Sequence, residues 1–245
     1  MADAFTIAVQ SMQNDLQRLD TISQNVVNST TPGYRRALTT PQTFGDVLQR
    51  TTLDGVSNAV SITLPAVSTV VDQSTGPLKS TGHALDVALD GDGYFELTTP
   101  QGLAYTRAGN FHLDDRGRLV SQDGYAVNGK GGDIVVSGKA PVTISAEGEV
   151  SEGDNVVGQL NIVAFADKHG LEKTATGLLK PTHADTQGKE SQARVRTGFL
   201  EGSNVVPLRE MVSMLETSRH FESQQKLFQG YDDQISTAIQ KLGQF

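Results

Sequence analysis

The stretch ALDVALDGDGYFELTTPQGLAYTRAGNF, residues 84–111, decides how the middle of the chain folds. It consists of short runs rich in apolar and aromatic residues, which alternate with glycine-containing turns. The runs are 86–89, 94–98 and 104–107. Glycine supplies the positive φ angles that tight connections between strands require. Similar runs, for example 134–136 and 142–144, follow as far as residue 200, so the sequence predicts an all-β domain over residues 76–203.

The N-terminal residues 1–36 have a helical period instead. Apolar residues three or four positions apart share one face of an α-helix. These residues are Phe5, Val9, Met12, Leu16, Leu19, Ile22 and Val26. Pro32 and Gly33 follow them and disfavour further helix, so we expect a helix of about 22 residues.

The C-terminal residues 204–245 have a seven-residue period. The apolar residues on this period are Met214, Phe221, Phe228, Ile235 and Leu242, and they are flanked by Met211, Leu215, Tyr231 and Ile239. Asn204 is a candidate N-cap, and Pro207 then falls in the first turn, where its missing N–H is not needed. We expect a helix over residues 205–242, and an apolar row of this kind requires a helical partner.

Together these patterns predict an α+β fold, with long N- and C-terminal helices that form a coiled-coil region and an all-β central domain. Residues 37–75, rich in Thr, Ser, Gln and Val, are predicted to be an extended connector. The predicted segments are therefore 1–36, 37–75, 76–203 and 204–245.

Two arrangements of the helices are open. They could pair with each other as an antiparallel hairpin within one chain, or they could pack against helices of other chains. The shorter helix would leave much of the longer apolar row uncovered, which favours partners from other chains and an interaction protein over an enzyme.

Composition excludes several classes of function. The 245 residues include no cysteine and carry a net charge of −8, which excludes disulfide frameworks and thiolate metal sites and argues against nucleic acid as a partner. Most of the acidic excess lies in residues 37–204, with 13 basic against 20 acidic residues. No segment approaches the roughly 20 apolar residues that span a bilayer, and the first residues lack the basic stretch of a signal peptide. We therefore expect no membrane insertion, and export by another route if the chain leaves the cytoplasm.

Residues that could carry chemistry are few and scattered. The five histidines have no metal-ligand spacing, and the sequence holds no phosphate-binding loop, so we expect no metal and no cofactor. The remaining enzyme hypothesis is a secreted carbohydrate-active enzyme that uses two carboxylates across a cleft. Its candidates are Glu147, Glu149, Glu152 and Asp154. Carboxylates in a glycine-rich stretch are more often solvated loop residues, so we expect no catalytic residue and no enzyme.

Three motifs carry a resemblance to a known family. Residues 23–35, SQNVVNSTTPGYR, are similar to the N-terminal motif of bacterial flagellar rod and hook proteins, although Val26 and Val27 replace its usual Leu-Ala. Residues 84–95 and 105–111 resemble the central block of the same family, and 198–205, GFLEGSNV, resembles the motif that opens its C-terminal helix. The motifs occur in the family's order along the whole chain.

This resemblance implies a structural subunit of the flagellar basal-body rod, which polymerises through its terminal helices into a tubular drive shaft for motility. It implies self-association, other axial proteins and the flagellar type III export apparatus as partners. It also implies location in the periplasmic span of the rod, without a cleaved signal. The details favour the proximal rod protein of the F type, with the distal rod protein of the G type or a hook-type subunit as the alternative. The implied assembly interface comprises the apolar helix residues named above, except Tyr231, together with Asn25, Asn28, Gly33 and Tyr34.

Overall fold

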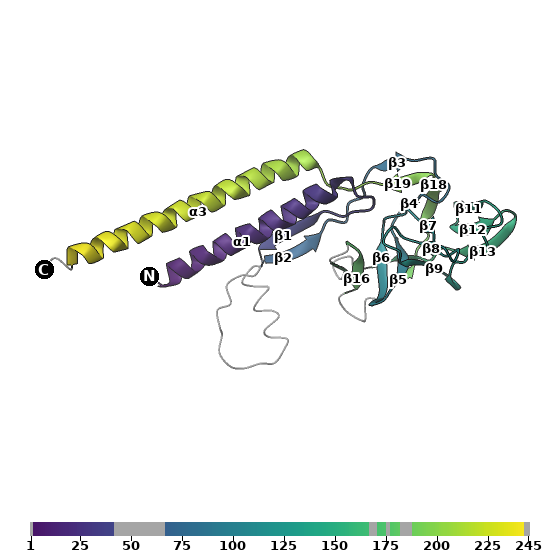
Figure 1. Ribbon diagram of the computed structural model, residues 1–245, viewed down its shortest axis with the longest axis horizontal. Coiled ribbons are helices and arrows are strands. Elements are labelled where there is room, and N and C mark those ends of the chain that lie inside the picture. The colour runs from purple at the N-terminus through teal and green to yellow at the C-terminus, as the bar shows by residue number, and fades with distance from the viewer. Residues whose placement is uncertain (1, 42–66, 167–170, 175–176, 182–187, 243–245) are drawn as a thin grey trace, which may run out of the picture. The chain divides into compact units, whose positions relative to one another are not determined.

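The computed structural model describes residues 2–41, 67–166, 171–174, 177–181 and 188–242 (Figure 1). The chain divides into two compact units. Unit 1 comprises Met1–Val27, Ala37–Val70 and Val206–Phe245, and unit 2 comprises Asn28–Arg36 and Val71–Val205. Each unit is built from segments that are distant in the sequence.

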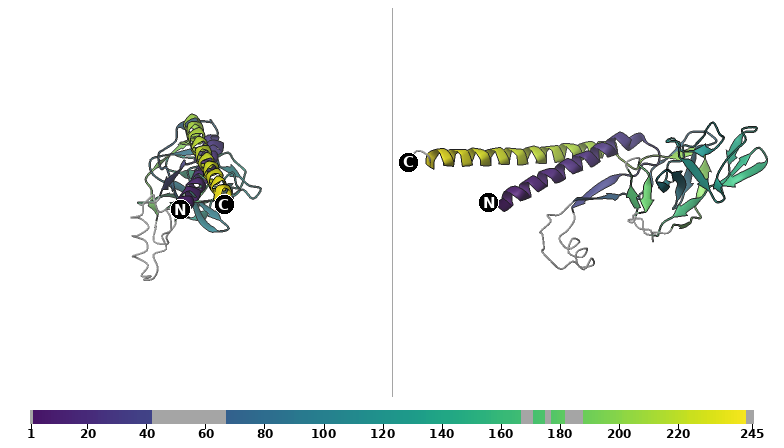
Figure 2. Two further views of the ribbon diagram at one scale, coloured as in Figure 1. Left: turned by 90° about the vertical axis from the view of Figure 1, so that its left-hand side faces the viewer. Right: turned by 60° about the horizontal axis from the view of Figure 1, so that its bottom comes forward.

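Unit 1 contains two helices and a two-stranded sheet. The helices are α1 (Ala2–Val27) and α3 (Pro207–Leu242), and the strands are β1 (Ala37–Pro41) and β2 (Val67–Val71). Figures 1 and 2 show α1 and α3 side by side and antiparallel, with α3 the longer helix. The structure therefore contains the antiparallel hairpin within one chain, which is the first of the two arrangements that the sequence left open.

The helix ends differ in part from expectation. α1 ends at Val27 and continues as a short 3-10 helix, η1 (Asn28–Thr30), before Gly33 turns the chain with a φ of 68°. Pro207 opens α3, as expected for a residue without an N–H to pair. The prediction that Asn204 caps α3 is wrong, because the N–H groups of Arg209 and Glu210 bond to the carbonyl oxygen of Val206, and the Asn204 side chain bonds to residues outside the helix.

Unit 2 is a β-rich unit whose strands pair antiparallel. A ten-stranded sheet has the order β15-β16-β6-β5-β9-β8-β7, with β10 beside β9, β14 beside β5 and β17 beside β14. A three-stranded sheet, β11-β12-β13, and two strand pairs, β18-β4 and β19-β3, complete it. The strands are β3 (Leu78–Ser80), β4 (Val87–Asp90), β5 (Tyr94–Thr99), β6 (Gly102–Thr106), β7 (His112–Leu113), β8 (Leu119–Val120), β9 (Ala126–Gly129), β10 (Gly132–Asp133), β11 (Val142–Ile144), β12 (Glu149–Glu152), β13 (Asn155–Gln159), β14 (Ile162–Ala164), β15 (Leu171–Lys173), β16 (Leu179–Pro181), β17 (Lys189–Glu190), β18 (Arg194–Thr197) and β19 (Phe199–Glu201).

The core of unit 2 lies between these sheets. Its larger cluster includes Phe95, Leu97 and Val150, all fully buried, and the ring of Phe95 meets that of Phe111 edge to face at 5.1 Å. A second cluster gathers Tyr94, Tyr105 and Phe165 with four aliphatic side chains.

The predicted fold class is wrong. The described residues form nineteen strands and only two α-helices, so strands rather than a coiled-coil region dominate the architecture. Among the side chains of α3 that the structure describes, the two most buried are polar, Glu210 and Thr217, whereas a coiled coil buries apolar residues at both alternating positions of its seam. The connector is also not simply extended, because β1 and β2 pair with each other. Residues 42–66 of that predicted connector lie outside the described residues.

Candidate assembly site

The face of α3 that meets α1 alternates polar and apolar residues. Glu210, Thr217 and Gln224 repeat every seven positions, and the half-buried Met214, Phe221 and Phe228 lie between them on the same face. Glu210 is 1% exposed and Thr217 is 3% exposed. We call this face the polar seam. The sequence reading detected its apolar half only.

Hydrogen bonds fix the register of the polar seam. His220 Nδ1 lies 2.7 Å from the Asp15 carboxylate, and the Gln224 amide donates to Ser11 Oγ at 2.8 Å. At the other end of α1, the buried Asn25 amide donates to the Glu210 carboxylate at 3.2 Å. Polar contacts of this kind specify one register but contribute less association energy than an apolar seam.

Asn25 also ties β1 to the helices of unit 1. Its side-chain oxygen accepts from the Ala37 N–H at 2.9 Å, and its amide donates to the Ala37 carbonyl at 2.8 Å. The side chain thereby pairs with the backbone of Ala37 as a neighbouring strand would. Asn25, predicted from the family resemblance as an interface residue, is 1% exposed and has this internal role.

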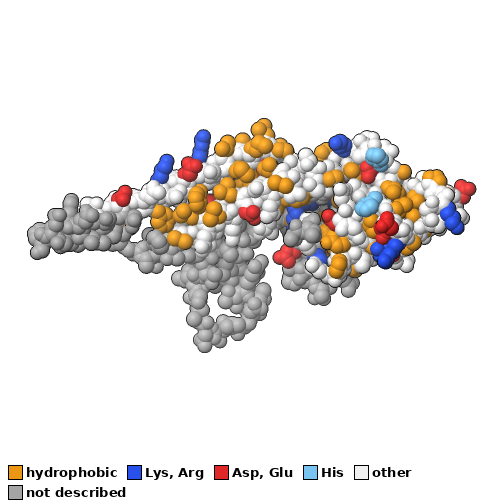
Figure 3. Space-filling view, viewed as in Figure 1, with side chains coloured by type: hydrophobic (Ala, Val, Ile, Leu, Met, Phe, Trp, Pro, Cys, Tyr) orange, Lys and Arg blue, Asp and Glu red, His pale blue; other side chains and the backbone are white. Residues whose placement is uncertain are grey.

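A second face of α3 has exposed apolar side chains. Leu208, Met211, Val212 and Leu215 have the spacing i, i+3, i+4 and i+7, which places them on one face over the first turns, with exposed fractions of 73, 50, 48 and 60%. We call these four residues the outer row. Figure 3 shows apolar side chains gathered along the helices of unit 1. Contiguous exposed apolar residues usually mark a site of association, whereas single ones need no explanation.

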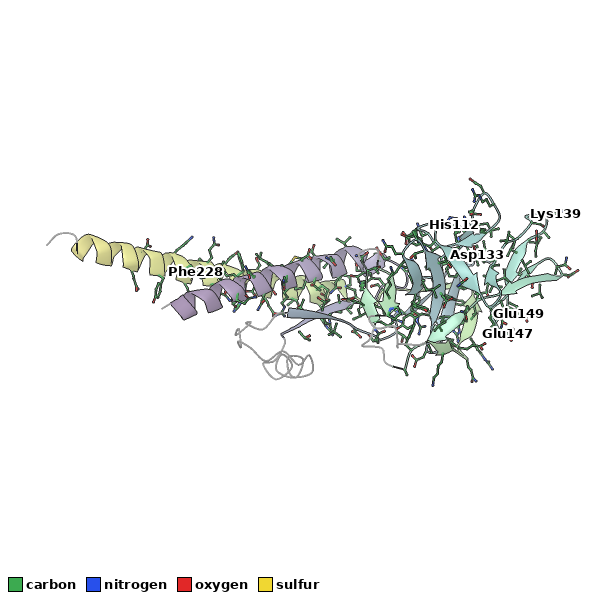
Figure 4. All side chains as sticks on the ribbon, turned by 90° about the horizontal axis from the view of Figure 1, so that it is seen from below. His112, Asp133, Lys139, Glu147, Glu149 and Phe228 are labelled. Carbon is green, nitrogen blue, oxygen red and sulfur yellow. The ribbon has the colours of Figure 1, made fainter. Side chains whose placement is uncertain are left out.

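The structure thus divides the predicted interface residues into groups. The exposed ones are Leu16, Met211 and Leu215, and the buried ones are Ile22, Asn25 and Tyr34. The half-buried ones are Val9, Met12, Leu19, Val26, Asn28, Gly33, Met214, Phe221 and Phe228, the last of which is labelled on α3 in Figure 4. Phe5, Ile235, Ile239 and Leu242 lie in the helices, and their side chains fall outside the described residues.

In unit 2, a buried ion cluster joins residues from all three family motifs. The Glu201 carboxylate accepts from Arg35 at 2.7 Å and from Arg107 at 3.3 Å, and the three residues are at most 4% exposed. Arg107 also donates to the Gly91 carbonyl at 2.7 Å and lies 5.4 Å from the centre of the Tyr94 ring. Burial lowers the pKa of Arg107, and the adjacent Glu201 carboxylate opposes this shift.

Glu201 also binds two backbone segments. Its carboxylate accepts from the Gly76 N–H at 3.0 Å, and its backbone carbonyl accepts from the Gly33 N–H at 2.7 Å. Nearby, Asn204 accepts from the Arg36 N–H at 2.7 Å and donates to the Asp72 and Ser74 carbonyls. We call the segments 28–36, 71–76 and 201–205 the collar of unit 2.

Two glycines of the collar allow close backbone approach. A Cβ on Gly33 would lie 2.2 Å from the nitrogen of Ala108, and a Cβ on Gly76 would lie 1.9 Å from the carbonyl oxygen of Gly202. Both positions therefore require glycine.

Sequence reasoning missed the ion cluster. Each of its charged residues stands within one of the quoted motifs, but nothing in one sequence shows that the three motifs meet. Lys173 was missed as well: its ammonium lies 3.2 Å from the centre of the Tyr34 ring and donates to the Arg35 carbonyl at 2.9 Å.

The carboxylates of the enzyme hypothesis have structural or solvated positions. Glu152 accepts from the backbone N–H groups of Ser137, Lys139 and Ala140, and these bonds lower its pKa to about 2. Glu147 and Glu149 are exposed, and Figure 4 shows them beside each other on unit 2. A carboxylate held ionised by a loop is a poor general acid.

Among the described residues, no group of three or more histidine, aspartate or glutamate side chains could hold a metal ion. Neither described helix has the length and apolar content needed to cross a membrane.

A row of exposed apolar side chains on a helix is typical of proteins that associate with other chains. Comparison with known proteins agrees. Residues 88–152 match the family described as the flagellar hook protein FlgE/F/G D1 domain, and residues 196–241 match the C-terminal family of flagellar basal body rod FlgEFG proteins.

Full-length relatives extend this result. The chain is 35% identical to the flagellar basal-body rod protein FlgG of Bacillus subtilis (strain 168), over 94% of this chain and 96% of the relative. It is 31% identical to the flagellar basal-body rod protein FlgF of Salmonella typhimurium and 32% identical to that of Escherichia coli (strain K12), in both cases over 99% of each chain. The chain belongs to the flagellar basal-body rod protein family, and its function is that of a structural rod subunit.

Proposed function

We propose that the chain polymerises through its terminal helices, and that the outer row of α3 is the surface that neighbouring subunits cover. The single observation that carries this proposal is the exposure of Leu208, Met211, Val212 and Leu215 on one helix face. Within unit 1, α3 meets α1 through the polar seam and leaves its apolar face free for a partner.

The energetics support this division. Complete burial of one Leu, Val or Met side chain contributes about 1.5–3 kcal/mol. Covering the exposed halves of four such side chains contributes several kcal/mol per contact, and the contact recurs in every subunit of a helical assembly. Leu16 on α1, 52% exposed, offers a further apolar group for the same purpose.

The family assignment supports the partners and location. The chain assembles in the flagellar basal body with other copies and with other axial proteins, in the periplasmic span of the rod, where it contributes rigid shaft material. It reaches that place through the flagellar type III export apparatus without removal of a leader. The intact mass of the subunit from purified basal bodies tests this, because removal of a leader would lower the mass. We further propose that 1–36 and 204–245 form the inner rod domain, that 76–203 forms an outer domain, and that 37–75 connects them.

Relatives of the F and G types match at similar identity, and the F type remains our prediction. The chain makes and breaks no bond in this role, and we propose that it is not an enzyme.

The test places a charge in the outer row. In a strain whose only copy of the chain carries Leu215→Asp, we expect no chain in purified basal bodies and no motility. Leu227→Asp is the matched control, because Leu227 is 71% exposed on the same helix but outside the outer row. Incorporation of Leu215→Asp at the level of the control would refute the proposal.

A further inference from the structure

The collar is attached to the rest of unit 2 mainly by polar contacts. The larger core cluster of unit 2 has fifteen side chains in the described residues, and none of them comes from the collar. The smaller cluster takes only Val71 from it. The apolar core can therefore persist when the collar is displaced, as in other local unfolding units.

The collar contributes to a buried ion cluster. Two guanidinium groups, Arg35 and Arg107, face one carboxylate, Glu201, and the Nε atoms of both arginines are buried without a hydrogen-bond partner. Glu201 contacts both other collar segments, through Arg35, Gly33 and Gly76, as Asn204 does through Arg36, Asp72 and Ser74. Asp72 also acts on Arg35 and Asp92 on Arg107, but Glu201 is the carboxylate that both guanidinium groups contact, so removal of its charge breaks two buried ion pairs at once.

We propose that Glu201 acts as a latch, which holds the collar closed on a β core that is stable without it. The chain passes between unit 1 and unit 2 at four points, and all four involve the collar: Val27–Asn28 after α1, Arg36–Ala37 before β1, Val70–Val71 within β2 and Val205–Val206 before α3. When the Glu201 contacts are broken, the collar segments that lead to unit 1 can move while the β core remains folded. Because assembly needs α1 and α3 in a defined position, a subunit with an open latch does not assemble; this last step rests on the proposed function.

The latch is tested in the purified chain, by hydrogen exchange of single amides. Glu201→Gln is isosteric and removes only the charge. Breaking a buried ion pair costs about 3–5 kcal/mol, so protection of the Gly33 and Gly76 amides should fall by about 100-fold or more. The Leu119 and Leu160 amides, which bond to Ile134 and Gly148 in the β core, should keep their protection.

Two further variants separate charge from packing. Arg107→Met also removes the Arg107–Glu201 contact, but it leaves the Glu201 carboxylate paired with Arg35. The hydrogen-exchange protection of the Gly33 and Gly76 amides should therefore stay within about tenfold of the wild type. Glu190→Gln breaks the exposed pair with Lys130 and should change nothing. If Glu201→Gln alone yields no folded protein, the double variant Glu201→Gln/Arg107→Met, which restores the wild-type net charge of the cluster, should recover it.

Retained protection of Gly33 and Gly76 in Glu201→Gln would overturn the latch, as would equal loss at Leu119 and Leu160. Failure of the double variant to fold would overturn the role of charge. Normal incorporation of a variant whose collar amides are exposed would leave the latch in place and overturn its link to assembly. None of these results depends on the outer row, so the latch and the proposed interface are tested separately.

Discussion

Replacement of Gly33 by alanine should lower the free energy of unfolding of unit 2, because Gly33 combines a positive φ with close contacts to the backbone of Arg107 and Ala108. The φ of 68° costs an L-residue roughly 1–2 kcal/mol. The new Cβ would lie 2.2 Å from the nitrogen of Ala108 and 2.5 Å from the carbonyl carbon of Arg107. Because both are backbone atoms, the chain must move by about 1 Å to reach normal contact, an overpacking that costs about 1–3 kcal/mol.

That movement also stretches the 2.7 Å bond from the Gly33 N–H to the Glu201 carbonyl, worth about 1 kcal/mol. The expected loss in the free energy of unfolding is therefore about 3–6 kcal/mol. Gly82→Ala is the matched control, because Gly82 has a φ of 72° and nothing within 4 Å of the added Cβ, so it should lose only about 1–2 kcal/mol.

The assay is urea unfolding followed by tyrosine fluorescence, since four of the five tyrosines, residues 34, 94, 105 and 125, lie in unit 2. The midpoint of Gly33→Ala should fall well below that of Gly82→Ala. Equal midpoints for the two variants would refute the inferred close approach of the collar to Arg107 and Ala108.

Three further predictions concern the seam and two charged side chains. Phe228→Asp puts a charge into the half-buried apolar half of the polar seam, so incorporation into rods should be lost while the circular dichroism of the β-rich unit is retained; normal rods would contradict it. The folded-state pKa of Glu152 lies at about 2, below its ordinary 4.5, so the stability gained over Glu152→Gln should be complete above pH 4.5 and disappear as the pH falls to 2, as measured by urea unfolding at each pH. Burial lowers the pKa of Lys173 from 10.5 to about 8. Between these pH values the Lys173 side chain is protonated in the unfolded chain and neutral in the folded one, so the free energy of unfolding relative to Lys173→Met should rise from pH 8 to 10.5. A fall over the same range would show that the fold prefers the charged form.

The sequence predicted the strands of unit 2 best where a run of apolar residues lies between two turns. Residues 142–144 coincide with β11, and 94–98 lie within β5. Residues 134–136 do not form a strand; only Val135 makes a bridge, to Arg118, although Ile134 and Val136 are 3 and 4% exposed. A run of apolar residues therefore indicates that side chains are buried, but it does not show that the backbone forms a strand.

The fold class failed for a related reason. The seven-residue period found Met214, Phe221 and Phe228 but gave no weight to Glu210, Thr217 and Gln224 on the same face. A polar residue can enter a helix contact when a partner on another segment satisfies it, as Asn25 does for Glu210. One sequence does not show such long-range partners, so the polar seam could not be predicted.

The ion cluster could not be predicted either, because one sequence does not show which distant residues meet. Arg35, Arg107 and Glu201 are separated by more than 70 positions each and have no shared period. The motifs identified the segments that matter, and only the fold shows that they meet.

The most direct test of the account uses the absence of cysteine from the chain. Leu215→Cys and Lys139→Cys, each the only thiol in its chain, are treated with a maleimide as purified monomer and in intact basal bodies. Lys139 is exposed on unit 2 (Figure 4). We predict that Leu215→Cys reacts rapidly in the monomer and at least about tenfold more slowly in basal bodies. A contact that favours the covered state of the thiol by about 1.4 kcal/mol lowers the accessible fraction tenfold. Lys139→Cys should react at the same rate in both. Equal reactivity of Leu215→Cys in monomer and basal body would contradict the claim that neighbouring subunits cover the outer row.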